Sequence, residues 1–143
     1  MLTIDTNVWV AGILTDEAAH GVSKKFLEWV RTKEPVLHLP TLLMAELAGA
    51  IIRRTGDQQL ADESWQLLAS FSLARFHELD SAAARHAATM AGQLKLRGPD
   101  AVHAATAFAT NSILITMDRE LAERAAPLVT TMTPEKWLSE CEP

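Results

Sequence analysis

The sequence contains very little cysteine. Among its 143 residues there is a single one, Cys141, which lies two residues from the end. A lone cysteine cannot form a disulfide within the chain, and it cannot build a cysteine-rich zinc site. We therefore expect a protein of a reducing compartment that does not depend on either kind of cross-link.

The chain also lacks a long hydrophobic run. The longest stretch without a formally charged residue, 101–117, is interrupted by His103, Thr106 and Asn111, whereas a membrane-spanning helix needs about 20 mostly apolar residues. At the start of the chain, Asp5 is reached before the apolar region of a signal peptide could form. These absences predict a soluble, cytoplasmic protein that does not contact a membrane.

Basic residues are outnumbered, and tyrosine is absent. The chain has 13 Lys and Arg against 18 Asp and Glu, a net charge of −5, and 6% of its residues are aromatic. A nucleic-acid partner usually requires a basic surplus, and base stacking requires aromatic side chains. The charge does not exclude such a partner, because four acids gathered in one metal site would leave the remainder at −1. Basic pairs that could guide a phosphate backbone remain at Lys24-Lys25, at Arg53-Arg54 and at Lys95 and Arg97.

Five short β-like runs alternate with helical segments along the chain. This alternation is typical of βαβ units with right-handed crossovers. We therefore predict an α/β fold, with a single domain over residues 1–143 and a central, mostly parallel, five-stranded sheet flanked by helices. The expected strands are 2–5, 36–39, 73–79, 113–117 and 128–132, and the expected helices are 22–31, 42–54, 57–71, 81–96, 99–110, 119–125 and 134–138.

Four acidic residues lie at informative places in this pattern. Ligands bind beyond the carboxyl ends of the strands in such sheets, where Asp5 ends the first expected strand and Asp118 follows the fourth. Asp100 lies in the first turn of an expected helix, where the helix dipole favours a carboxylate. Glu46 is the only charged residue in 42–52, on the narrow polar edge of an otherwise apolar helix.

Each acid alone has an ordinary explanation, but the set does not. Asp5 suits a turn, Asp100 and Asp118 suit the start of a helix, and Glu46 suits a solvated edge. Together they would repel one another unless a positive ion lay among them. Oxygen ligands without a Cys/His cluster suit Mg²⁺ or Mn²⁺, and divalent ions held by carboxylates hydrolyse phosphodiesters. The pattern therefore indicates a metal-dependent hydrolase.

The same residues carry a resemblance to a known family. The chain resembles PIN-domain nucleases, and within them the VapC-type ribonuclease toxins of type II toxin–antitoxin systems. The matching segments are Leu2-Thr3-Ile4-Asp5-Thr6-Asn7-Val8, Met44-Ala45-Glu46-Leu47, Asp100-Ala101-Val102-His103-Ala104-Ala105-Thr106-Ala107 and Ile115-Thr116-Met117-Asp118. Their order and spacing, with the four acids 41, 54 and 18 positions apart, suit compact members of that family.

The resemblance implies an endoribonuclease that hydrolyses RNA phosphodiester bonds with Mg²⁺, or with Mn²⁺ as a substitute. It also implies a homodimer that a cognate antitoxin protein holds inactive. Asp5 and Asp100 correspond to the most direct metal ligands, Asp118 completes the site, and Glu46 either binds the metal or orients the attacking water. The polar groups that support the ligands or face the substrate correspond to Thr6, Asn7 and Thr116.

Three other residues have less certain places in this scheme. His103 lies one helical turn after Asp100, and we expect a structural or substrate-edge role in preference to that of a general base. Met117 stands where the family often has a small polar residue, so the hydrogen bonding beside Asp118 is expected to differ. Trp9 could line a partner groove, although its apolar neighbours favour the core.

Two other functions remain as alternatives. A phosphoacceptor signalling domain also binds Mg²⁺ through acids at strand ends, but it needs an acceptor aspartate at the end of a middle strand. Asp80, which is the candidate here, is better explained as a helix N-cap. A metal-binding PIN-like interaction module without nuclease turnover is the other alternative, and the presence of all four acids favours an enzyme over it.

Overall fold

Five short parallel strands form the centre of the molecule. The computed structural model describes the backbone of residues 1–141 and the side chains of residues 1–140, so the side chain of Cys141 and the last two residues of the expected domain lie outside it. The strands pair in the order β3-β2-β1-β4-β5, and every pair is parallel. The predicted α/β class and five-stranded parallel sheet are confirmed. The strands are β1 (Leu2–Ile4), β2 (Leu37–Pro40), β3 (Ala74–His77), β4 (Ile113–Ile115) and β5 (Thr131–Met132).

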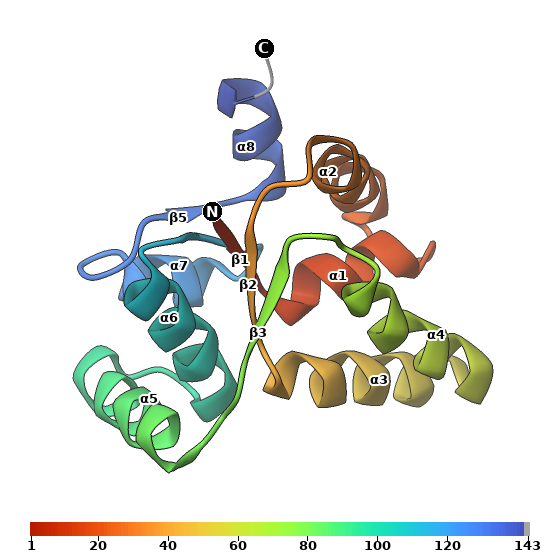
Figure 1. The fold of residues 1–143 in the computed structure, drawn as a ribbon. Helices are drawn as coiled ribbons and strands as arrows, with labels where there is room; N and C mark the ends of the chain where they lie inside the picture. The colour runs from red at the N-terminus through yellow and green to blue at the C-terminus, as the bar shows by residue number, and fades with distance from the viewer. Residues whose placement is uncertain (142–143) are drawn as a thin grey trace.

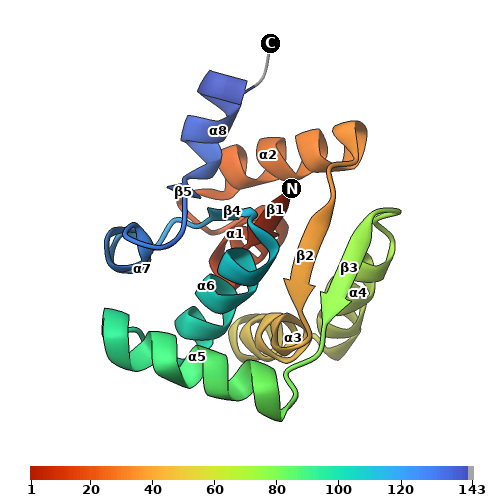
Figure 2. The ribbon, with the colours of Figure 1, turned by 60° about the vertical axis from the view of Figure 1, so that its left-hand side comes forward.

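Helices cover both faces of this sheet (Figure 1). On one face lie α1 (Thr6–Ile13), α2 (His20–Lys33), α3 (Leu42–Thr55), α4 (Gln58–Ala69) and α8 (Pro134–Cys141), and on the other lie α5 (Ser81–Leu94), α6 (Gly98–Thr110) and α7 (Arg119–Ala125). Figure 2 shows the two groups from a second direction, with β2 and β3 side by side and their arrowheads toward the end of the molecule where α3 begins. Two hydrophobic cores result, one under each face.

The inner strands β1, β2 and β4 are mostly apolar because they are buried on both faces. In β1, the side chains of Leu2 and Ile4 point into the core under α1 and α3, and Thr3 points to the opposite face. A buried hydroxyl needs a hydrogen-bond partner, and the Thr3 hydroxyl lies 2.7 Å from that of Ser112, just before β4. Through this bond, β1 is tied to the turn that ends α6.

All seven predicted helices are present, with their ends shifted by no more than three residues. Gly56 ends α3 with a positive φ of 69°, a conformation that glycine adopts without strain. Asp80 caps α5, since its carboxylate accepts a hydrogen bond from the N–H of Ala83 at 2.8 Å. This cap is the role expected for Asp80, and it leaves the phosphoacceptor alternative without its aspartate.

The sequence pattern did not predict helix α1, which begins one residue after Asp5. The run from Val8 to Val10 is β-branched and aromatic, which lowers its helix propensity. Burial overrides that propensity, because Trp9 is fully buried and contacts Phe71 edge-to-face. Gly12 allows α2 to approach closely, since a Cβ at that position would lie 2.4 Å from the side chain of Leu27. Trp9 is therefore part of the core, as expected, and does not line a groove.

The edge strands are shorter than predicted. Only Thr131 and Met132 pair with β4, and β3 covers four residues of the seven expected.

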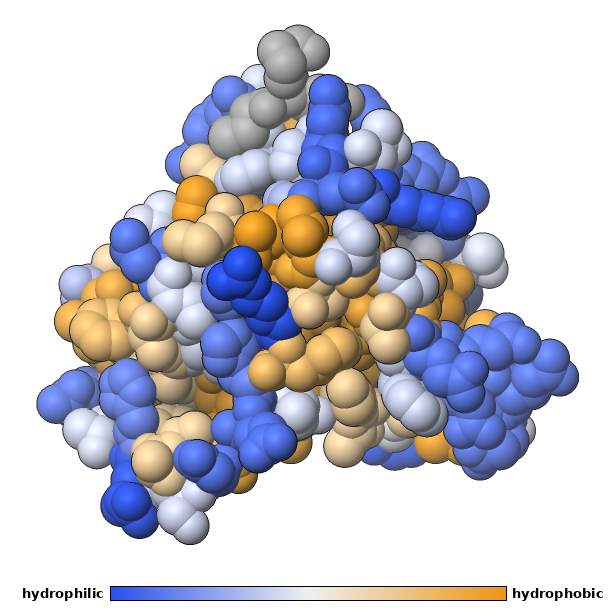
Figure 3. Space-filling model, viewed as in Figure 1, coloured by the Kyte–Doolittle hydropathy of each residue, from blue (hydrophilic) through white to orange (hydrophobic). Residues whose placement is uncertain are grey.

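The surface of the face seen in Figure 1 is uneven in polarity. Figure 3 shows that hydrophobic residues reach the surface over the middle of this face, whereas the right-hand side, where α4 begins, is polar. Within the described part of the chain, no helix is both long enough and apolar enough to span a membrane.

The position of Glu46 depends on how the buried face of helix α3 packs against the core. A substitution on that face tests this packing. Leu47 is fully buried, and we expect Leu47→Ala to lower the free energy of unfolding by about 2–5 kcal/mol, measured by urea denaturation. Leu73→Ala makes the same change at a leucine that is 45% exposed and should cost less than about 0.5 kcal/mol. Equal losses in the two variants would show that α3 does not pack as described.

Candidate functional site

The candidate site lies where the strand order of the sheet reverses direction. The chain places β2 and β3 on one side of β1 and then places β4 and β5 on the other. Ligands of open α/β sheets bind in the crevice outside the carboxyl ends of the strands at such a switch point. Asp5 directly follows β1, and its N–H bonds to the carbonyl oxygen of Ile115 at the end of β4. Asp118 follows β4 three residues later, so two of the four predicted acids flank this crevice.

Asp5 uses its carboxylate inside the site and not as a helix cap. It occupies the N-cap position of α1, but its side chain makes no capping hydrogen bond. Its Oδ2 atom instead accepts a hydrogen bond of 2.7 Å from the hydroxyl of Thr116, and the residue is only 6% exposed. The turn explanation of Asp5 therefore does not account for where its side chain lies.

Thr116 connects Asp5 to the loop that carries Asp118. The Thr116 hydroxyl accepts hydrogen bonds from the N–H of Asp118 at 3.0 Å and from Nδ2 of Asn7 at 3.3 Å. Asn7 completes the connection, because its Oδ1 accepts from the N–H of Met117 at 3.3 Å. Only the backbone of Met117 takes part, so its apolar side chain does not interrupt this network.

Asp118 uses its two oxygen atoms differently. Its Oδ1 caps α7 by accepting from the N–H of Leu121 at 3.0 Å, as the sequence suggested. Its Oδ2 accepts from the Arg97 guanidinium at 2.9 Å, and the same guanidinium donates to Oδ2 of Asp100 at 2.8 Å. Arg97 thus bridges two of the predicted metal ligands. Sequence reasoning noted Arg97 only as a basic residue, although its place three positions before Asp100 was a usable signal.

Glu46 is held by two residues from other helices. Nε2 of His103 donates to Oε2 of Glu46 at 2.9 Å, and the hydroxyl of Thr6 donates to the same oxygen at 2.8 Å. His103 is 1% exposed and also lies 3.9 Å from Oδ1 of Asp5. Helices α1, α3 and α6 therefore meet at Glu46, and His103 lies among the acids.

Burial and neighbouring charges shift the pKa values of three of these groups. Burial raises the pKa of Asp5, with Asp100 and Glu46 adding to the rise and His103 and the Thr116 hydroxyl opposing it. Burial would lower the pKa of His103, but the hydrogen bond to Glu46 and the nearby carboxylates raise it overall. Partial burial would raise the pKa of Glu46, but the hydrogen bonds from His103 and Thr6 lower it overall. Glu46 and His103 therefore form a pair that favours carboxylate with imidazolium.

The chemistry of these side chains fits a hard divalent cation. Asp5 is a nearly buried carboxylate with carboxylate neighbours, and the donors are oxygen atoms of the kind that Mg²⁺ and Mn²⁺ prefer. The Arg97 guanidinium and the imidazole of His103, whose raised pKa favours its protonated form, lie against the carboxylates. In residues 1–140, no group of three or more His, Cys, Asp or Glu side chains is positioned closely enough to hold a metal ion without rearrangement.

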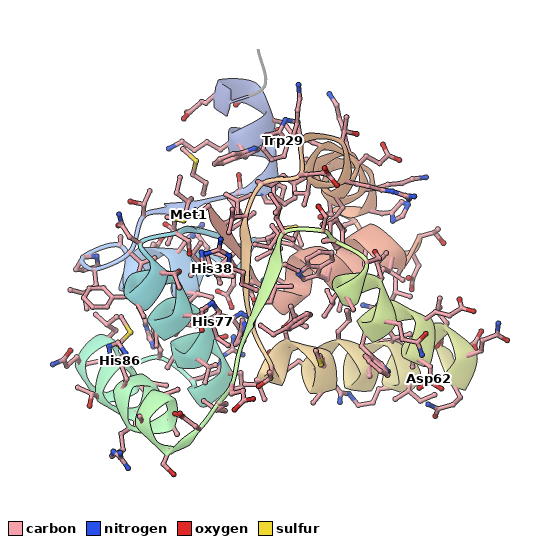
Figure 4. The ribbon with its side chains drawn as sticks, viewed as in Figure 1. Met1, Trp29, His38, Asp62, His77 and His86 are labelled. Atoms are coloured by element: carbon pink, nitrogen blue, oxygen red, sulfur yellow. The ribbon has the colours of Figure 1, made fainter. Side chains whose placement is uncertain are left out.

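A second polar pair lies away from these acids and was not predicted. Nδ1 of His38 and Nε2 of His77 are 2.8 Å apart on the neighbouring strands β2 and β3. Figure 4 shows the two rings side by side, toward α6. Burial and the nearby His77 lower the pKa of His38. Since one nitrogen must donate and the other accept, the contact favours a pair in which at least one ring is neutral.

Comparisons with known proteins agree with the fold. The family described as "PIN domain" matches residues 2–127. No curated protein matches the chain significantly.

Several solved structures share the fold at low sequence identity. VapC20 from Mycobacterium tuberculosis, described as a sarcin-ricin loop cleaving toxin, has a TM-score of 0.75 at 20% identity, over 90% of this chain and 97% of that one. FitAcB from Neisseria gonorrhoeae has a TM-score of 0.70 at 19% identity, over 94% and 99% of the two chains. VapBC2 from Rickettsia felis, solved bound to a DNA fragment from their promoter, has a TM-score of 0.68 at 15% identity, over 92% of this chain and 97% of that one. At these identities the likeness shows the fold.

The raised pKa of Asp5 predicts a gain in stability when its charge is removed. Between 3.8 and the higher pKa of the folded state, the folded protein binds more protons than the unfolded chain, so stability falls as pH rises through that range. The loss grows with pH until the Asp5 carboxyl of the folded protein is ionised. We expect metal-free Asp5→Asn to melt a few degrees above the wild type at pH 7.

The difference in melting temperature should shrink as the pH is lowered toward 3.8. Asp62→Asn, at an exposed position on α4, controls for the loss of one negative charge and should melt like the wild type. If Asp5→Asn melted below the wild type at pH 7, the ionised carboxylate would be stabilising and our account of its burial would be wrong.

Proposed function

Because the chain belongs to the PIN-domain family, we propose that it is a divalent-metal-dependent endoribonuclease. The observation that carries the proposal is that contacts through Thr116, His103 and Arg97 connect four acids from four separate segments, namely Asp5, Glu46, Asp100 and Asp118. Repulsion among such groups is unfavourable unless a cation offsets it. The reaction that suits this set of ligands is hydrolysis of an RNA phosphodiester bond by water.

Each acid has a separate part in the proposed reaction. Asp5 and Asp100 bind the ion directly, and Asp118 completes its ligands through Oδ2, because its Oδ1 caps α7. Bound Mg²⁺, or Mn²⁺ in its place, supplies positive charge that activates a water and stabilises the leaving oxygen. Glu46 binds the ion or orients the attacking water.

The surrounding polar groups hold these carboxylates in place. Thr116 fixes one oxygen of Asp5, while Thr6 and His103 fix one oxygen of Glu46. The lowered pKa of Glu46 keeps it ionised, so it can accept a hydrogen bond from the water. The new bond forms between the water oxygen and phosphorus as the phosphorus–oxygen bond to the leaving group breaks, and no covalent intermediate with the protein forms.

We also propose that this nuclease is the toxin of a toxin–antitoxin pair, acts as a homodimer and works in the cytoplasm. The support for the toxin role comes from similar structures, since VapC20 is described as a toxin and a structure from Klebsiella pneumoniae as a toxin–antitoxin complex. The exposed Lys24 on α2 and Arg53 on α3 offer charge for an RNA backbone on an otherwise acidic protein, whereas Arg54 already pairs with Asp16 and Glu17.

A cleavage assay on total RNA tests the proposed activity. With Mg²⁺ or Mn²⁺ present, we expect the purified chain to release discrete fragments, and a chelator should abolish them. Asp100→Asn should lower the rate at least about a hundredfold, because it removes a direct ligand. Asp62→Asn, which alters an exposed aspartate on α4 (Figure 4), should cleave like the wild type.

Two outcomes of this assay would contradict the proposal. Full activity in Asp100→Asn would remove that residue from the site. Mn²⁺ binding without cleavage of any RNA by the folded, antitoxin-free chain would favour the alternative of a metal-binding interaction module.

A further inference from the structure

Arg97 lies directly on the proposed metal ligands. It is the N-cap residue of α6, its Nε donates to Asp100 at 2.8 Å, and another guanidinium nitrogen donates to Asp118 at 2.9 Å. These contacts connect acids that are 18 positions apart in the chain. The guanidinium therefore supplies positive charge at the place where a divalent ion is proposed to bind.

The Arg97 guanidinium and a divalent ion would compete for the same carboxylate oxygens. Arg97 contacts Oδ2 of Asp100 and Oδ2 of Asp118. On Asp118, Oδ1 already accepts from the N–H of Leu121 at the start of α7, so Oδ2 is the oxygen better placed for an ion. An ion at this pair therefore competes with the guanidinium for Oδ2 of Asp118.

The Arg97 side chain is free to move away from these carboxylates. It is 71% exposed, whereas the side chains of Asp100 and Asp118 are 17% and 26% exposed. The backbone of Arg97 is extended, with φ −67° and ψ 154°, and its side chain makes no capping hydrogen bond to α6. A rotation of this long side chain therefore leaves the helix intact.

A guanidinium released beside bound divalent ions has a suitable second partner in the substrate. Its planar set of N–H donors matches two oxygens of a phosphate as well as it matches carboxylates. We propose that Arg97 is a substrate-binding residue, which releases Asp100 and Asp118 to the divalent ion and binds a phosphate of the RNA instead. This inference rests on the proposed nuclease function.

The first test measures metal binding alone. We expect Mn²⁺ to bind metal-free Arg97→Gln about three- to tenfold more tightly than the wild type by calorimetry, because the competing cation is gone. Arg119→Gln is the matched control. Arg119 lies next to Asp118 in sequence, is 91% exposed and pairs with Glu123, so its loss removes the same charge without touching the site. It should change the affinity less than about twofold.

The second test measures RNA cleavage at saturating Mn²⁺. We expect Arg97→Gln to raise KM about three- to tenfold, and Arg97→Lys to restore part of the loss, because lysine keeps the charge but not the two parallel donors. Arg119→Gln should keep the KM of the wild type within about twofold.

The outcomes separate this inference from the proposed function. If the wild type cleaves RNA while Arg97→Gln keeps its Mn²⁺ affinity, the inference is wrong and the nuclease stands. A tighter Mn²⁺ affinity with an unchanged KM would likewise overturn the substrate role. If the wild type does not cleave RNA in any metal, the proposed function itself fails.

Discussion

Burial of the Asp5 carboxylate among other acids is the constraint on which the rest of the site depends. A carboxylate that is 6% exposed loses most of its hydration, and Asp100 and Glu46 add repulsion to that loss. The surrounding structure reduces this penalty with the hydroxyl of Thr116 and the imidazole of His103. Such an arrangement stores unfavourable charge at a position where a cation would be favourable. Stability and the proposed metal binding therefore pull in opposite directions at this residue.

The topology of the sheet explains why these groups meet. Because β1 lies in the middle of the order β3-β2-β1-β4-β5, the segments after β1 and β4 leave the sheet next to each other, on either side of the switch point. Helix α3 supplies Glu46 from one face, and α6 supplies Asp100 and His103 from the other. No single element carries the site, so its geometry depends on the packing of both cores against one thin sheet.

Sequence reasoning located the acids better than it located their partners. Asp5, Asp100 and Asp118 could be chosen because strand ends and helix starts are local features, and the PIN resemblance is confirmed by the family match. Their role as metal ligands stays a prediction. Helix α1 was missed because burial of Trp9 outweighs the low helix propensity around it. The contact of Glu46 with His103 and that of Arg97 with Asp118 join positions 57 and 21 residues apart, and no local pattern encodes such pairings.

The segment from Asp5 to Asn7 has a further consequence for how this chain can vary. Three consecutive side chains are bonded to two other parts of the molecule: Asp5 and Asn7 to the loop that follows β4, at Thr116 and Met117, and Thr6 to Glu46 on α3. They lie at the junction of a strand and a helix, where the side-chain period changes from two to 3.6. An inserted or deleted residue here would move all three partners out of reach at once, whereas a substitution would disturb only one. Among variants of this protein, changes of length should therefore fall in the loops before β2 or after α7 and not at this junction.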